Sequence, residues 1–207
     1  MPMTTLIIAR HGNTFDPGQT PTRVGARTDL PLVDKGREQA RAIGRYLKDN
    51  RLIPDVVYAS QLKRTQETAQ IAVKESGVTN PVYTLDIFNE IDYGPDENQP
   101  EDAVIARIGA DAIKDWDERA IVPPGWNADP AQIIHNWQGF AEQIRAHDDN
   151  ETVLVVTSNG IARFAPHLTG DFEGFKKQHT LKLATGALAV FRYEGNRWTV
   201  KDWNIKP

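Results

Sequence analysis

The sequence of 207 residues contains no cysteine. This absence excludes disulfide bonds, thiolate nucleophiles and zinc sites built on thiolates, while it leaves the cellular compartment open. Long runs of basic residues are also missing and the formal net charge is −4, so we expect no nucleic-acid-binding surface. Any anionic ligand must therefore be held by a few individually placed cations.

Long hydrophobic runs are lacking as well. The first residues, MPMTTLIIARHG, have no basic segment before a short apolar run, which is far shorter than a membrane span or a signal-peptide core. We therefore expect no membrane association and take the cytoplasm as the default location. A chain of this length can bury a sizeable core, and we predict a single domain over residues 1–207.

The apolar residues that are present alternate between strand and helix patterns. Strands are predicted at residues 6–9, 55–59, 152–157, 187–193 and 198–203, of which the last two form a hairpin. Helices are predicted at residues 34–47, 60–73, 101–119, 129–144 and from 161 onward, with Asp34 and Ser60 as the first two N-caps. This order predicts a three-layer α/β fold: a mostly parallel sheet with helices on both faces and room for an antiparallel edge.

Polar groups of a matching kind follow three of the predicted strands. They are Arg10, His11, Gly12 and Asn13 after the first, Ser60, Lys63 and Arg64 after the second, and Ser158, Asn159 and Gly160 after the third. Ligands of open α/β sheets bind outside the carboxyl ends of the strands, so these groups are expected to meet. Taken singly, the Arg-His pair is better explained as a satisfied surface pair, and the two cations are better explained as a solvated helix face. Together they describe an anion site made of guanidinium groups, helix N-termini and one imidazole.

His11 has a specific use in such a site. A neutral imidazole can attack phosphorus when its other ring nitrogen is held as a donor, and the resulting phosphohistidine is hydrolysed later. The reaction needs charge stabilisation and an acid for the leaving oxygen, but neither a metal nor a cofactor. A small phosphorylated substrate is the partner that this chemistry predicts.

These residues resemble the histidine phosphatase superfamily, also called the phosphoglycerate mutase-like family. The similarity rests on Arg10-His11-Gly12, on Gly25, Asp29, Pro31, Leu32, Gly36, Gln39 and Ala40, on SQLKRTQETA at 60–69, and on FNEIDYG at 88–94. The four segments occur in the family's order and span nearly the whole chain. The resemblance implies the phosphoglycerate mutase-like fold and a phosphatase with His11 as nucleophile, Arg10 and Arg64 as phosphate ligands, and Glu90 as proton donor.

The sequence departs from the family's pattern at the last strand end. The family usually reads Val-Ser-His-Gly-Gly there, whereas this chain reads VTSNG, so that Ser158 takes the place of a second catalytic histidine. A hydroxyl keeps one donor but brings no charge. We therefore predict slow turnover, with Ser158 as a weak donor and with Asn13 and Gly160 beside the phosphate.

Other histidines and other functions were weighed against this interpretation. His167 is expected too far along a helix to replace the missing ring, His147 suits a helix C-terminus and His135 a core edge, while His179 could approach the site. The acidic stretch GPDENQPED departs from the mutase pattern and favours a phosphatase over a glycolytic mutase. The alternative from another class is a protein that binds or senses a phosphorylated ligand with little turnover.

Overall fold

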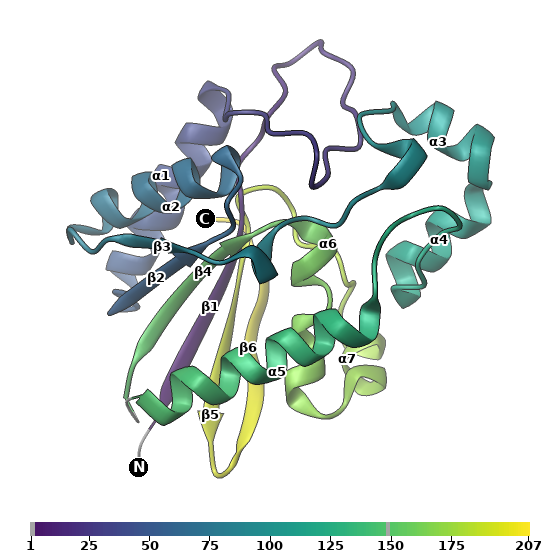
Figure 1. The fold of residues 1–207 in the computed structure, drawn as a ribbon. Helices are drawn as coiled ribbons and strands as arrows, with labels where there is room; N and C mark the ends of the chain where they lie inside the picture. The colour runs from purple at the N-terminus through teal and green to yellow at the C-terminus, as the bar shows by residue number, and fades with distance from the viewer. Residues whose placement is uncertain (1–2, 148–149) are drawn as a thin grey trace.

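A computed structural model describes residues 3–147 and 150–207, and its centre is a six-stranded sheet in the order β3-β2-β4-β1-β5-β6 (Figure 1). The strands are β1 (Thr4–Arg10), β2 (Val56–Ala59), β3 (Val82–Thr84), β4 (Thr152–Thr157), β5 (Leu188–Glu194) and β6 (Arg197–Ile205). The first four strands of that order are parallel to one another, whereas β5 pairs antiparallel with both β1 and β6. The predicted α/β class, the mostly parallel sheet and the closing hairpin are confirmed.

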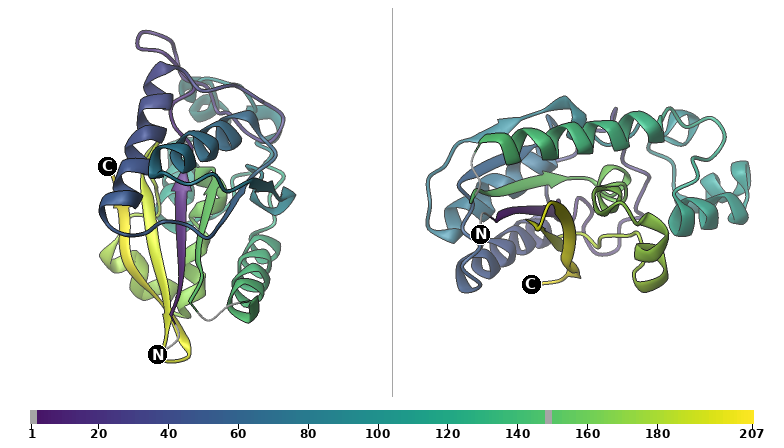
Figure 2. Two further views of the ribbon diagram at one scale, coloured as in Figure 1. Left: turned by 90° about the vertical axis from the view of Figure 1, so that its left-hand side faces the viewer. Right: turned by 90° about the horizontal axis from the view of Figure 1, so that it is seen from below.

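Helices cover both faces of the sheet. They are α1 (Asp34–Asp49), α2 (Lys63–Ser76), α3 (Glu101–Ile108), α4 (Ala110–Arg119), α5 (Pro130–His147), α6 (Asn159–Ala162) and α7 (Phe172–Gln178), with short 3-10 turns η1 (Asp86–Phe88), η2 (Gly94–Asp96) and η3 (Ala165–Thr169). Figure 2 shows α5 and α1 on opposite sides of the sheet. Figure 1 shows α3 and α4 outside these layers, beside the loop that follows β1.

The alternation of side chains along β1 produces two cores. Leu6 and Ile8 point into the core that includes α5, and Ile7 and Ala9 point into the core formed with α1 and α2. Successive residues of a strand face opposite sides of the sheet, so an unbroken apolar run is what a strand covered on both faces requires. This packing fixes the register and with it the position of the residue after the strand.

Parallel pairing brings the predicted strand ends to one level. Arg10 pairs with Thr157 across β1 and β4, and Ala59 pairs with Val156 across β2 and β4. His11, Ser60 and Ser158 therefore leave the same edge of the sheet. Among the described residues, no helix is long and apolar enough to cross a membrane.

The predicted N-caps are wrong by one to two residues. Asp34 is the first residue of α1, after Val33 at the N-cap position, and α2 begins at Lys63, after Leu62. Ser60 stays in register with the sheet because its N–H donates to the Val156 carbonyl at 3.2 Å, so it cannot start the helix.

Two predicted helices are shorter than the apolar pattern indicated. The helix at 101–119 is divided at Gly109, whose φ of 86° ends α3 before α4 begins. The helix after Ser158 ends at Ala162, and Pro166 then lies in η3, where a proline cannot continue α-helical hydrogen bonding. The helix predicted from residue 161 onward is therefore present, but it begins at Asn159 and is only four residues long. The short strand β3 and helix α7 were not predicted.

Candidate active site

A cavity of about 760 Å³ opens at the carboxyl edge of the parallel strands. Four of the seven predicted site residues line it, namely Arg10, His11, Asn13 and Glu90. The other three, Arg64, Ser158 and Gly160, are buried and do not belong to its lining. The fold thus brings the predicted residues to one region, where four of them are accessible from the cavity and three lie behind its surface.

His11 is oriented by its own neighbour. Its Nδ1 lies 2.8 Å from the Gly12 carbonyl oxygen. Because a carbonyl can only accept, Nδ1 carries the proton, and the neutral ring keeps its lone pair on Nε2. Burial lowers the pKa of His11 well below its ordinary value, and the charges of Arg64 and Arg10 lower it further. The ring therefore remains neutral and nucleophilic near neutral pH.

Gly12 allows this arrangement by close packing rather than by contact with a ligand. A Cβ at this position would lie 2.3 Å from the Gly36 carbonyl oxygen of α1. The Gly12 N–H also donates to the Thr68 hydroxyl at 3.1 Å. The turn after β1 is therefore fixed against both helices of one layer.

Two guanidinium groups are held next to His11 by backbone carbonyls. Arg10 Nη1 donates to the Leu183 carbonyl at 2.7 Å, and Arg64 Nη1 donates to the Thr28 carbonyl at 2.7 Å. The Nε atoms of both arginines are buried without a partner among the described residues. Burial lowers the pKa of both side chains, while Glu90 is the largest influence that raises it. Unpaired buried donors on cations are costly, and an anion placed there would satisfy them.

Glu90 is held at the cavity wall by two backbone amides. One carboxylate oxygen accepts from the Ile91 N–H at 2.9 Å, and the other accepts from the Gly160 N–H at 3.2 Å. No ion pair to this carboxylate is found within the described residues. The N–H of Gly160, which we predicted beside phosphate, is thus engaged by Glu90.

Ser158 is completely buried, and its hydroxyl has no partner among the described residues. It occupies the N-cap position of α6 without a side-chain capping bond. Thr157 before it donates to the Phe88 carbonyl at 2.7 Å, and the Asn159 side chain accepts from the Leu183 N–H at 2.9 Å. The neighbours of Ser158 are therefore committed to the scaffold, whereas its own hydroxyl is free.

Asn13 lines the cavity with its backbone fixed at both ends. Its N–H donates to the Gln39 side chain at 2.8 Å, and its carbonyl accepts from the Val33 N–H at 3.1 Å. No hydrogen bond of its side-chain amide is found within residues 3–147 and 150–207, so the amide is available to a ligand. The role that we predicted for it stays a prediction.

The structure brings none of the remaining histidines to the cavity lining. His167 stacks on Phe172 with ring centroids 3.8 Å apart, and His179 lies against Phe175 with centroids 4.8 Å apart. His135 is exposed on α5, not at a core edge as expected, and His147 faces Glu151. Within the part of the chain that the structure describes, His11 is therefore the one histidine at the cavity.

Arg163 is a cavity residue that the sequence argument missed. It is 1% exposed, its guanidinium lies 3.9 Å from the centre of the Trp116 ring, and its Nη1 donates to the Trp116 carbonyl at 2.6 Å. Burial lowers the pKa of Arg163 to about 10. A basic residue five positions after Ser158, close to the predicted strand end, was the available signal.

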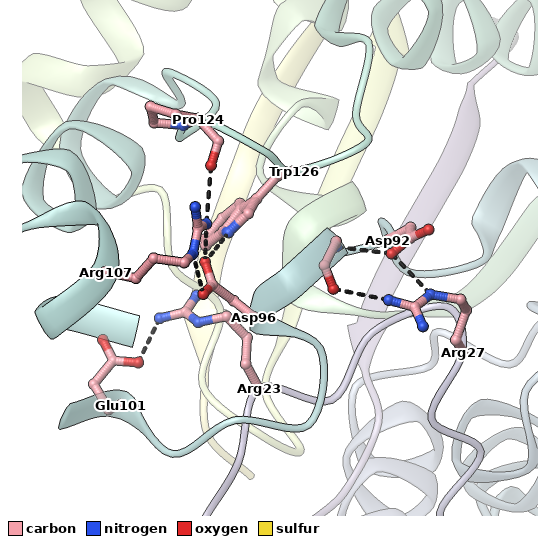
Figure 3. A network of polar contacts seen from close by, with 9 residues as sticks. Arg23, Arg27, Asp92, Asp96, Glu101, Arg107, Pro124 and Trp126 are labelled. Atoms are coloured by element: carbon pink, nitrogen blue, oxygen red, sulfur yellow. Dashed lines mark hydrogen bonds and ion pairs between the residues drawn. The ribbon is translucent and has the colours of Figure 1, made fainter. Parts of the chain in front are cut away.

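A network of polar contacts includes Arg23 and Glu101, two residues that line the cavity (Figure 3). The buried carboxylate of Asp96 accepts two bonds from Arg107 and one from the Trp126 ring nitrogen, the last at 2.7 Å. The hydrogen bonds from Arg107 hold the pKa of Asp96 below its usual value. Arg23, which lines the cavity, stacks on Trp126 and pairs with Glu101 at 2.6 Å. The loop after β1 is thereby tied to α3.

A family model for the histidine phosphatase superfamily (branch 1) matches residues 6–206. The chain belongs to this superfamily. The resemblance seen in the sequence motifs is thereby confirmed at the level of the family. As a member of this superfamily, the histidine phosphatase homologue is a phosphatase-type enzyme.

Its similarity to two named relatives extends over more than nine tenths of their length. It is 25% identical to the protein named uncharacterized phosphatase PhoE of Bacillus subtilis, over 98% of this chain and 95% of that one. It is 29% identical to the 2,3-bisphosphoglycerate-dependent phosphoglycerate mutase of Brucella melitensis biotype 2, over 91% of both chains. The solved structure of mycobacterial hydrolase 1 matches with a TM-score of 0.81 at 17% identity, over 99% of this chain and 100% of that one.

Proposed function

We propose that the protein is a metal-independent phosphomonoesterase that works through a phosphohistidine on His11. The observation that carries this proposal is the unprotonated Nε2 of His11 next to two arginines with unpartnered buried Nε atoms. A small phosphomonoester would place its phosphoryl oxygens on those donors and its phosphorus before Nε2.

The reaction then has two steps. The Nε2 lone pair forms the N–P bond, the bond from phosphorus to the leaving oxygen breaks, and protonated Glu90 gives its proton to that oxygen. Water next attacks phosphorus, Glu90 takes a proton from the water, and the N–P bond breaks to release phosphate. Arg10 and Arg64 would stabilise the charge on the phosphoryl oxygens in both steps.

Ser158 would make both steps slow. One well-placed donor to developing charge is worth about a hundred- to a thousand-fold in rate, and a neutral hydroxyl recovers only part of this. The four residues of α6 add little dipole stabilisation. The burial of the hydroxyl, away from the cavity lining, supports the same conclusion.

Hydrolysis of an aryl phosphate in the presence of EDTA tests this function. We expect slow release of phosphate that EDTA does not reduce. If calorimetry shows binding of inorganic phosphate but no phosphate is released from the ester, the protein is instead a phospho-ligand-binding protein. The unpartnered hydroxyl of Ser158 is the observation that would favour this alternative.

The substitution Ser158→His should raise kcat by at least about tenfold, because a charged ring adds the donor that the site lacks. The inhibition constant of inorganic phosphate should change less than kcat. Ser158→Ala is the matched control, since it removes the hydroxyl without adding a ring. An unchanged kcat, in a variant whose crystal structure shows the ring against bound phosphate, would contradict the argument.

A further inference from the structure

Gly160 packs directly against the carboxylate of Glu90. A Cβ on Gly160 would lie 2.2 Å from Glu90 Oε1 and 3.0 Å from Glu90 Cδ. The first distance is shorter than real Cβ contacts and the second is tighter than most of them, so a side chain at this position would displace the carboxylate. The two residues are 70 positions apart in the chain, and they meet only because β4 ends beside the segment that carries Glu90.

The backbone conformation of Gly160 does not require glycine. Its φ is not among the positive values, unlike Gly77 with φ 91° or Gly109 with φ 86°. Gly160 is also the second residue of α6, where glycine is less favourable than alanine. The contact with Glu90 is therefore the feature that explains the missing side chain.

The amide of Gly160 also orients the carboxylate. Glu90 Oε2 accepts from the Gly160 N–H at 3.2 Å, while Oε1 accepts from the adjacent Ile91 N–H at 2.9 Å. Within the described residues, Gly160 thus supplies the one hydrogen bond that reaches the Glu90 side chain from outside its own segment. Both the hydrogen bond from Gly160 and the absence of a Cβ at this residue determine where the Glu90 carboxylate lies.

We infer that Gly160 is a positioning residue for the proton donor Glu90 and is not a phosphate ligand. The inference rests on the proposed function, in which Glu90 protonates the leaving oxygen. A proton donor acts only within hydrogen-bond reach of its acceptor, and a displacement of about 1 Å costs roughly a hundredfold. The residues that follow β4 would therefore position the proton donor Glu90 as well as contact the phosphoryl group.

The substitution Gly160→Ala tests the inference. The atom that the new methyl meets is the end of a flexible side chain, so the fold should persist while the carboxylate moves. We expect kcat/KM to fall about a hundredfold for an alkyl phosphate, which needs protonation, and less than about fivefold for an activated aryl phosphate. The inhibition constant of inorganic phosphate should stay within about twofold.

Gly139→Ala is the matched control. Gly139 lies within α5, and a Cβ there would meet no atom within 4 Å. Thermal melting of both variants separates loss of fold from loss of positioning. We expect Gly139→Ala to leave the kcat/KM of both substrates unchanged.

Two further variants make the outcome decisive. Glu90→Asp shortens the side chain by one methylene and so leaves room for a methyl group at position 160. Adding Gly160→Ala to Glu90→Asp should therefore lower kcat/KM for the alkyl phosphate far less than adding it to the wild type. This double variant keeps the inference testable even if Gly160→Ala alone fails to fold. Equal losses on alkyl and aryl phosphates with weaker phosphate inhibition would make Gly160 a phosphate ligand and overturn the inference. If Glu90→Gln itself lowers kcat/KM no more for an alkyl phosphate than for an aryl phosphate, the assignment of Glu90 in the proposed function fails instead.

Discussion

Replacement of His11 by alanine is expected to lower turnover by roughly 10⁴- to 10⁶-fold and to abolish acid-labile phosphate on the protein. The reason is that the alanine variant has no group that can form the covalent intermediate, whereas the arginines that bind phosphate remain. Rapid-quench experiments with a labelled phosphomonoester measure both quantities in one sample.

The comparison that isolates His11 is His135→Ala, which removes an exposed histidine of α5. That control should incorporate phosphate as the wild type does. The His11→Ala variant should still bind inorganic phosphate, because its cations are fixed by carbonyls of Leu183 and Thr28 and not by the imidazole. Turnover that survives in the alanine variant would remove the phosphohistidine from the mechanism.

The position of His11 could be predicted from the sequence because it depends on local pattern. The run from Leu6 to Ala9 is apolar at every position, which predicts a strand covered on both faces, and the polar group after it must lie at the carboxyl edge. The same reasoning places Ser158 after β4. In the structure, Arg10 pairs with Thr157, so the ends of β1 and β4 lie at the same level as expected.

Other features depend on contacts between distant segments, and no local pattern encodes them. The pattern that predicted one helix at 101–119 does not show that Gly109 divides it, and the short α6 depends on Pro166 as well as on packing. The stacking of Arg163 on Trp116 joins residues 47 positions apart. Glu90 was assigned by the family resemblance alone, and its partner Gly160 became visible only in the folded chain.

Replacement of Glu90 by glutamine is expected to lower kcat/KM for an alkyl phosphate by about 10²- to 10⁴-fold. The alkoxide is a poor leaving group and must be protonated as the P–O bond breaks, which an amide cannot do. An activated aryl phosphate leaves without protonation, so its kcat/KM should fall by less than about tenfold. Because kcat/KM reports phosphoenzyme formation, the comparison is free of the later step in which Glu90 acts as a base.

Glu142→Gln provides the control, since Glu142 is an exposed carboxylate on α5 and the substitution is chemically the same. It should leave both substrates unaffected. The glutamine at position 90 has nearly the same size but only one acceptor oxygen, so it can accept from one of the two N–H groups, that of Ile91 or that of Gly160, and not from both. Because the proposed phosphate ligands are Arg10 and Arg64, inorganic phosphate should inhibit as before. Equal losses of kcat/KM on the alkyl and the aryl ester would mean that Glu90 supports the wall without donating a proton, and the acid would then have to be sought among the other groups that line the cavity.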